Sequence, residues 1–155
     1  MSADDDVDGF DSGVEELDRW LRSSARVAAA ARTAATDVLC RGEQIVGYYA
    51  LAMSAVAPEP APSRLSRGMP DPVPAVSLAR LALDLTEHGT GLGGHLLIDA
   101  LGRCVRGGRE FGARAVVVDA TSDEAAGFYL HFASHQLDET RLWRRIGDIE
   151  RSPEK

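Results

Sequence analysis

The chain has 155 residues, 45% of them hydrophobic, and a formal net charge of −7 at pH 7. This length is typical of one domain with a real core. No run of apolar residues approaches the ~20 that a transmembrane helix needs. The N-terminus is acidic where a signal peptide would be basic, so we expect a soluble protein of the cytoplasm.

The negative charge is concentrated at the start of the chain. Five aspartates and no basic residue occur in residues 1–11, which leaves 17 basic and 19 acidic residues, a net charge of −2, for the remainder. We expect residues 1–11 to form an acidic, flexible segment, residues 12–150 to form the domain, and residues 151–155 to be a charged tail.

Two groups of arginines recur at the spacing that places side chains on one face of a helix. They are Arg19, Arg22 and Arg26 near the start of the chain, and Arg103, Arg106 and Arg109 in its second half. Such a face is either solvated or binds phosphate groups, and the sequence leaves both alternatives open.

The first predicted element is a helix. Residues 12–15, Ser-Gly-Val-Glu, match a capping box. Apolar residues then follow at the three-and-four spacing of an amphipathic helix, namely Val14, Leu17, Trp20 and Leu21. We expect the helical region to continue, with one break, to Arg32.

Two apolar runs at residues 36–40 and 45–52 predict a β-hairpin, in which Gly47 marks a bulge. Six of the seven prolines crowd into residues 58–74, which we expect to be a loop and not a domain linker. Residues 76–84 then predict a buried strand, apolar on both faces.

A glycine cluster at residues 88–94, His-Gly-Thr-Gly-Leu-Gly-Gly, lies between this strand and a helix predicted to begin near Leu92. Glycines let the backbone turn sharply and direct several N–H groups at one anion, at the positive end of a helix dipole. The cluster therefore predicts a phosphate-binding loop.

The loop also matches G-x-G-x-x-G through Gly89, Gly91 and Gly94. A dinucleotide-binding unit would place this motif after its first strand, with an acidic residue ending the second strand. Here the motif is in the middle of the chain, and the nearest acid at that distance, Glu110, lies on the helix. The sequence therefore favours a cofactor that is bound by a single loop and the neighbouring strand.

The helix after the loop carries an apolar stripe and ends at residues 107–108 or at Gly112. The stripe consists of Leu92, Leu96, Leu97, Ala100, Leu101, Cys104 and Val105. Cys40 and Cys104 lie far apart, so we expect two buried free thiols and neither a disulfide nor a nucleophile.

Residues 113–120 predict another buried strand, a short helix opens at residues 122–124 and runs through Phe128 and Tyr129, and residues 140–149 are a weaker strand. Strands and helices alternate, which predicts an α/β (α+β) single domain with a mixed, mostly antiparallel sheet flanked by helices.

These residues resemble the GNAT family of acetyl-CoA-dependent N-acetyltransferases. The pyrophosphate motif of that family is Gln/Arg-x-x-Gly-x-Gly/Ala, which residues 88–93 match at both glycine positions. His88 replaces the usual Gln or Arg, and Thr90 stands where closer relatives often carry a basic residue.

The resemblance extends over nearly the whole chain and narrows to the GNAT toxins of toxin–antitoxin pairs, of the TacT and AtaT type. The segments that carry it are residues 10–21, 46–51, 69–74, 78–84 and 125–129. Residues 132–134, Phe-Ala-Ser, depart from the Phe-Gly-Phe turn of these relatives. The resemblance implies the GNAT fold and acetyl-CoA as the cofactor.

The resemblance also implies how the site residues act. Backbone N–H groups of a splayed strand, here Leu81, Ala82 and Leu83, would polarise the acetyl carbonyl. Tyr129 would protonate the departing thiolate, because a phenol of pKa ~10 stays protonated at neutral pH while a thiol pKa is nearer ~8.5. From the residues alone, a core aromatic beside Phe128 is an equal alternative for Tyr129.

Further contacts follow from the same resemblance. The residues expected to bind the cofactor are Leu81, Ala82, Leu83, His88, Gly89, Thr90, Gly91, Leu92, Gly93, Gly94, Ser122 and Phe128. The residues expected to contact RNA are Arg19, Arg22, Arg26, Arg64, Arg67 and Arg80.

No general base is evident, since Glu87, His88 and Glu124 are interpreted as solvated loop residues. An α-amino group of pKa near ~8 would need little help to lose its proton. His131 and His135 have the spacing of a metal pair but lack a third ligand and an adjacent glutamate, so we expect no metal.

The resemblance implies a toxin that acetylates the α-amino group of aminoacyl-tRNA and blocks translation, with a ribbon-helix-helix antitoxin as its partner and a homodimeric state. Two alternatives stand beside it. One is a GNAT enzyme that acetylates a small amine or a protein amine. The other is a catalytically degenerate module that binds CoA or a protein partner without turnover.

Overall fold

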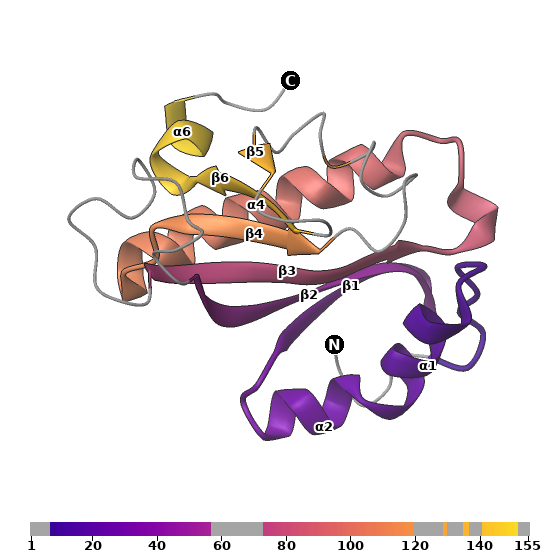
Figure 1. Ribbon diagram of the computed structural model, residues 1–155. Coiled ribbons are helices and arrows are strands. Elements are labelled where there is room, and N and C mark those ends of the chain that lie inside the picture. The colour runs from indigo at the N-terminus through magenta and orange to yellow at the C-terminus, as the bar shows by residue number, and fades with distance from the viewer. Residues whose placement is uncertain (1–6, 57–72, 120–128, 130–134, 137–140, 152–155) are drawn as a thin grey trace. The chain divides into compact units, whose positions relative to one another are not determined.

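The computed structural model describes residues 7–56, 73–119, 129, 135–136 and 141–151 (Figure 1). Its helices are α1 (Glu15–Ser23), α2 (Ala25–Ala30), the 3-10 helix η1 (Leu85–Glu87), α4 (Leu92–Phe111) and α6 (Ile146–Arg151). Its strands are β1 (Ala35–Arg41), β2 (Gln44–Val56), β3 (Val73–Leu83), β4 (Ala115–Asp119), β5 (His135–Gln136) and β6 (Arg141–Arg145). None of the helices in these ranges combines the length and the apolar character needed to cross a bilayer.

The chain forms two compact units. The first comprises residues 1–52 and 79–100, and the second comprises residues 53–78 and 101–155. The strand order is β1-β2-β3 in the first unit and β3-β4-β6-β5 in the second. The segments β2, β3 and α4 each contribute residues to both units.

The first unit contains the predicted β-hairpin, which is confirmed. β1 pairs antiparallel with β2, from Ala35 opposite Leu51 to Arg41 opposite Gln44. Gly42 begins the tight turn between them with a φ of 62°, a conformation that hairpin turns need and glycine adopts without strain.

The predicted bulge lies next to Gly47. Leu39 pairs with Gly47 but Cys40 pairs with Ile45, so Val46 is the extra residue. A Cβ atom on Gly47 would lie 3.0 Å from Leu83 Cδ2 and 3.4 Å from the Ala82 carbonyl oxygen. Glycine at this position therefore lets β2 approach the last residues of β3 closely.

The core of the first unit joins the N-terminal segment to α1, α2, β2 and β3. Its buried side chains are Val7, Phe10, Leu21, Ala25, Ile45, Tyr48 and Ala82. Val7 and Phe10 belong to the segment that the sequence predicted to be flexible. The expectation for residues 1–11 is therefore wrong from Val7 onward, because these two side chains gain burial in the core.

The start of α1 differs from the predicted capping box. The helix begins at Glu15 after Val14, and the residue that pairs with Ser12 is Asp18, not Glu15. The Ser12 N–H and hydroxyl donate to Asp18 Oδ1 at 3.0 Å and 2.7 Å. The predicted break occurs at Ser24, and the helical region ends at Ala30, two residues before Arg32.

The second unit contains the parallel pair of β3 and β4, from Ala75 opposite Ala115 to Leu78 opposite Val118. β6 pairs antiparallel with both β4 and β5. Its core cluster consists of Val73, Ala75, Ala115, Val117 and Trp143. The strands predicted at residues 76–84 and 113–120 are confirmed, whereas β5 was not predicted.

The end of α4 settles the alternative between residues 107–108 and Gly112. The helix ends at Phe111, and Gly112 follows with a φ of 85°. The Gly112 N–H donates to the Gly108 carbonyl at 2.8 Å, the bond of an αL cap, and the Ala113 N–H donates to the same carbonyl at 3.1 Å, the outer bond of a Schellman motif. Of the predicted apolar stripe, Leu96, Leu97, Ala100 and Cys104 are buried.

Residues 140–149 are not one strand, as predicted, but a strand followed by a helix. The ladder with β4 ends at Arg145, and α6 starts at Ile146. The Arg145 guanidinium donates to both carboxylate oxygens of Asp148 at 3.1 Å. This pair, three residues apart, stabilises the first turn of the helix. The helix predicted at residues 122–129 lies outside the described residues except for Tyr129, which is helical.

Neither cysteine forms a disulfide. Cys104 is buried as predicted, and burial raises the pKa of its thiol to about 12. Cys40 is exposed, contrary to the prediction, because β1 is the edge strand of its unit.

Candidate functional site

The glycine cluster connects η1 to α4 within the first unit, as predicted. Gly89 and Gly91 have φ values of 79° and 83°, in the left-handed region that favours glycine. A Cβ atom placed on Gly89, Gly91 or Gly94 would meet no atom within 4 Å. The space beside this backbone is therefore open, and it lies at the N-terminus of a helix of 20 residues. Both features suit an anionic group.

Thr90 shapes the loop from within. Its hydroxyl donates to the Glu87 carbonyl at 2.7 Å and accepts from the Leu92 N–H at 3.3 Å. The first helical residue of α4 is thereby tied to the turn before it. A basic residue at this position would lack the short hydroxyl that makes both contacts.

His88 ties the loop to the end of β3. Its Nε2 lies 2.9 Å from the Leu83 carbonyl oxygen, so Nε2 carries the proton and donates it. The side chain is exposed, as predicted, but it is not only solvated. With the proton on Nε2, the ring nitrogen left to accept a hydrogen bond is Nδ1.

Two acidic residues brace the turn before the loop. Asp84 is 4% exposed and accepts hydrogen bonds from the Asp11 N–H at 2.9 Å and from the Thr86 hydroxyl at 2.7 Å. Glu87 is 7% exposed and accepts two hydrogen bonds from the Arg41 guanidinium, at 2.8 Å and 2.9 Å. The expectation that Glu87 is a solvated loop residue is wrong, because Glu87 is buried and forms a bidentate ion pair with Arg41 of the hairpin.

The same contacts keep both carboxyl groups ionised. Burial alone would raise the pKa of Asp84, but the hydrogen bonds from the Asp11 N–H and from Thr86 outweigh it and hold that pKa below its usual value. The hydrogen bonds from Arg41 lower the pKa of Glu87. A carboxylate that is paired and strongly acidic is a poor base, so Glu87 is no candidate for accepting the amine proton.

These shifts predict how stability depends on pH. Because the folded-state pKa of Asp84 is depressed, its contribution to stability is fully present above the unfolded value of ~3.9 and is lost as the pH falls through the folded value. We expect Asp84→Asn to lower the free energy of unfolding at pH 7 and to differ less from the wild type at pH 3. Denaturant unfolding at both pH values measures this difference.

Glu110→Gln is the matched control, since Glu110 is exposed at the end of α4. We expect it to change the free energy of unfolding little at either pH. An Asp84→Asn effect of equal size at pH 7 and pH 3 would show that the carboxylate charge is irrelevant.

The three strand residues expected to bind the acetyl group lie at the end of β3. Ala82 is buried, and Leu81 and Leu83 are half-buried. Among the residues that the structure describes, the ladder between β3 and β4 ends at Leu78, before this segment. The Asp84 N–H donates to the Val46 carbonyl at 2.9 Å, so the bulged strand β2 holds the end of the segment.

The remaining predicted site residues are placed as follows. Tyr129 lies in the second unit and is 7% exposed. Arg19, Arg22 and Arg26 are exposed on α1 and α2, and Arg19 pairs with Glu15 at 3.4 Å. Arg80 is half-buried on β3. The predicted residues that lie outside the described part of the chain are Arg64, Arg67, Ser122, Glu124, Phe128, His131 and residues 132–134.

Within the described ranges, no three His, Cys, Asp or Glu side chains are placed to hold a metal ion. The structure thus brings together the glycine loop, its two acidic braces and the strand residues 81–83 in the first unit. This arrangement suits an anionic group at the loop, next to the backbone of residues 81–83.

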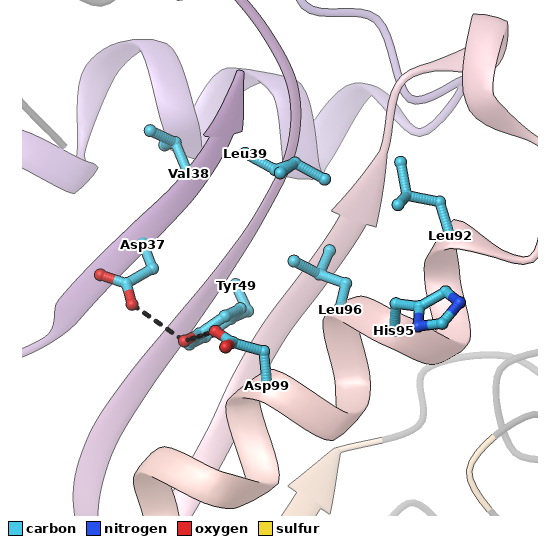
Figure 2. Close-up of a pocket in the computed structure, with 8 residues that line it drawn as sticks. All are labelled: Asp37, Val38, Leu39, Tyr49, Leu92, His95, Leu96 and Asp99. Carbon is cyan, nitrogen blue, oxygen red and sulfur yellow. Dashed lines mark hydrogen bonds between the residues drawn. The ribbon is translucent and has the colours of Figure 1, made fainter. Parts of the chain in front are cut away.

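A separate pocket of about 290 Å³ was not predicted from the sequence. Residues from β1, β2 and α4 line it, namely Asp37, Val38, Leu39, Tyr49, Leu92, His95, Leu96 and Asp99 (Figure 2). Figure 2 shows the Tyr49 hydroxyl between the two carboxylates, 2.9 Å from Asp37 Oδ2 and 2.6 Å from Asp99 Oδ2. Asp37, Tyr49 and Asp99 lie far apart in the sequence, so the sequence does not show that they come together.

The Tyr49 hydroxyl is expected to contribute to stability. The hydroxyl has one proton to share between two carboxylates. Tyr49 as a residue is 1% exposed. We expect Tyr49→Phe to lower the free energy of unfolding by about 1–2 kcal/mol, because the carboxylates of Asp37 and Asp99, which are half-buried and exposed, lose a hydrogen-bond donor. Adding Asp99→Asn should recover part of the loss by removing one charge. Denaturant unfolding of the single and double variants tests both statements, and an unchanged Tyr49→Phe variant would contradict them.

Comparison with known proteins gives the following relationships. No family model matches the sequence. The chain is 48% identical over 132 residues to a tRNA-acetylating toxin of Mycobacterium tuberculosis (strain ATCC 25618 / H37Rv), with 85% of this chain and 80% of the relative covered.

Two solved structures extend the comparison. AtaT complexed with acetyl-methionyl-tRNAfMet matches with a TM-score of 0.87 at 26% identity, covering 97% of this chain and 94% of that one. A tyrosine-to-phenylalanine mutant of AtaT, bound to the C-terminus of the antitoxin AtaR and acetyl-CoA, matches with a TM-score of 0.82 at 26% identity, covering 97% and 92%. The predicted fold class is confirmed by these matches.

Proposed function

Because the chain belongs to the tRNA-acetylating toxins, a branch of the GNAT acetyltransferases, we propose that it transfers the acetyl group of acetyl-CoA to the α-amino group of an aminoacyl-tRNA and thereby blocks translation. The structural observation that carries the proposal is the glycine loop, whose backbone faces open space at the start of α4. The relatives, a tRNA-acetylating toxin and AtaT in complexes with acetyl-methionyl-tRNA and with acetyl-CoA, support the same chemistry.

The residues of this chain fit acetyl-CoA, which supplies an activated thioester. The backbone N–H groups of residues 88–94 would hold its pyrophosphate, since the left-handed Gly89 and Gly91 leave room for the phosphates. His88 and Thr90 contribute by shaping the loop, through their contacts with the Leu83 and Glu87 carbonyl groups. We propose Ser122 and Phe128 as further contacts.

The chemical step follows from the same residues. The amine nitrogen attacks the thioester carbonyl carbon, and N–H groups of Leu81, Ala82 and Leu83 stabilise the negative charge that develops on the carbonyl oxygen. Tyr129 donates its phenolic proton to the departing sulfur. With Glu87 paired to Arg41, we propose that the amine proton passes to water. An α-amino pKa near ~8 makes this feasible at neutral pH.

The partners and location belong to the proposal as well. We propose that six arginines contact the RNA phosphates, namely Arg19, Arg22, Arg26, Arg64, Arg67 and Arg80. We further propose that a ribbon-helix-helix antitoxin neutralises the protein, that it forms a homodimer, and that it acts in the cytoplasm, where aminoacyl-tRNA is used. AtaT bound to the C-terminus of AtaR supports the antitoxin.

The test combines expression with purified enzyme. Expression of the protein alone should stop growth, and labelled acetyl-CoA should transfer its acetyl group to charged tRNA. Transfer to a polyamine or peptide with none to charged tRNA would replace this function with that of a small-amine or protein acetyltransferase. Saturable acetyl-CoA binding without transfer to any amine would indicate a degenerate module.

A further inference from the structure

Arg80, Trp20 and Tyr48 form a three-layer stack in the first unit. The guanidinium carbon of Arg80, on β3, lies 4.5 Å from the centroid of the Trp20 ring, on α1. Trp20 stacks on Tyr48, on β2, with 6.0 Å between ring centroids and 11° between ring planes. The Tyr48 hydroxyl donates to the Leu17 carbonyl at 2.7 Å, which fixes the base of the stack to α1.

Tyr48 forms the uncharged lowest layer of this stack. Burial raises the pKa of its phenol well above the usual value, with the positive charge of Arg80 opposing the shift. Trp20 therefore lies between a buried, uncharged ring and a guanidinium cation. An indole ring is the best of the aromatic side chains for such a cation–π contact.

Arg80 is engaged in a different way from other arginines of the chain. Arg41 and Arg145 each direct two N–H groups at a carboxylate. Arg80 places its guanidinium carbon over the Trp20 ring, and within the described part of the chain no hydrogen bond or carboxylate engages its N–H groups. These groups project in the plane of the guanidinium, in a fork that matches phosphate.

The position of Arg80 relates it to the reaction. It directly precedes Leu81 to Leu83 on β3, and a strand advances about 3.3 Å per residue. The cation is thus close to the segment that would hold the acetyl group, while the glycine loop follows the other end of that segment. In an aminoacyl-tRNA, the phosphate groups nearest the reacting amine are those of the 3′ end.

We propose that Trp20 is a positioning residue that holds Arg80 ready to bind a phosphodiester near the 3′ end of the acceptor RNA. This inference rests on the proposed function. Holding the guanidinium in place before the RNA arrives reduces the side-chain entropy lost on binding. Trp20 acts only through Arg80, which makes the two residues energetically coupled.

The experiment compares Arg80→Met, Trp20→Leu and the double variant. We expect Arg80→Met to raise the KM for charged tRNA about tenfold, the effect of one lost charged hydrogen bond, with the KM for acetyl-CoA unchanged. The salt dependence of tRNA binding should lose about one unit of slope. Trp20→Leu should raise the same KM by a smaller factor, and Trp20→Phe should restore most of it because it keeps an aromatic face.

The double variant separates positioning from folding. On the Arg80→Met background, Trp20→Leu should raise the KM for charged tRNA no further. Phe10→Leu is the matched control. Phe10 belongs to the same core and packs edge-on against Tyr48, with 5.6 Å between the ring centroids. It should lower the melting temperature and leave the KM for charged tRNA unchanged.

Three results would overturn the inference. A rise in the KM for acetyl-CoA with Arg80→Met would assign the arginine to a cofactor phosphate. A full Trp20→Leu effect on the Arg80→Met background would make Trp20 a structural residue only. Equal, salt-dependent binding of uncharged tRNA by the wild type and Arg80→Met would also overturn this inference. If the wild type acetylates no charged tRNA, the proposed function fails, and this binding measurement still tests the inference.

Discussion

Tyr129→Phe is expected to lower kcat for acetyl transfer about 10²- to 10⁴-fold, the usual contribution of a positioned proton donor. The substitution removes only the phenolic oxygen. The ring stays, and since Tyr129 is 7% exposed, its packing volume is retained. The expected defect is therefore chemical: the sulfur would leave as an unprotonated thiolate. Cells that express the variant should grow where cells that express the wild type stop.

The measurement is single-turnover transfer of labelled acetyl groups to charged tRNA, together with direct binding of acetyl-CoA. We expect acetyl-CoA to bind Tyr129→Phe as it binds the wild type. Tyr49→Phe is the matched control, because it removes a second buried phenol, which the proposed chemistry does not use. Wild-type turnover by Tyr129→Phe would leave this tyrosine as a core aromatic.

The second large effect is expected at Gly91, where valine should weaken acetyl-CoA binding about 10- to 100-fold. Gly91 has a φ of 83°, and a β-branched residue in that region is a genuine outlier. Strain of this kind costs about 1–3 kcal/mol. The loop can relieve it only by turning its N–H groups away from the phosphates. Titration calorimetry with acetyl-CoA gives the dissociation constant directly.

Gly107→Ala provides the control for this prediction. A Cβ atom at Gly107 also meets nothing within 4 Å, but the residue lies inside α4 with ordinary helical φ. Alanine there should stabilise the helix by about 0.5–1 kcal/mol and leave acetyl-CoA binding unchanged. If Gly91→Val bound acetyl-CoA as tightly as the wild type, the loop backbone would not be the phosphate site.

Local signals in the sequence predicted much of this site. The run of apolar residues before the glycine cluster and the stripe after it placed β3, the loop and the start of α4 correctly. Such patterns depend on neighbours within a few residues, which the sequence displays directly. The left-handed glycines could be predicted because no other residue adopts that conformation without cost.

Contacts between distant segments could not be predicted in this way. Arg41 and Glu87 are separated by 46 residues, and nothing near Glu87 in sequence indicates its partner. Tyr49 and Asp99 are likewise 50 residues apart. At the start of α1, the spacing of Ser12 and Glu15 matched a capping box, and only the path of the backbone brings Asp18 to Ser12 instead. The turn from β6 into α6 depends on where the ladder with β4 ends.

The contact between Asp11 and the turn at Asp84 has a consequence for local motion. The Asp11 N–H donates to the Asp84 carboxylate, and the Leu85 N–H donates to the Asp11 carbonyl at 2.8 Å. The two bonds join the same two segments, so we expect the two amides to exchange with solvent deuterium through one shared opening. The segment around Asp11 thus stabilises the turn that leads into the glycine loop. We expect a truncation that removes Asp11 to make this turn more mobile.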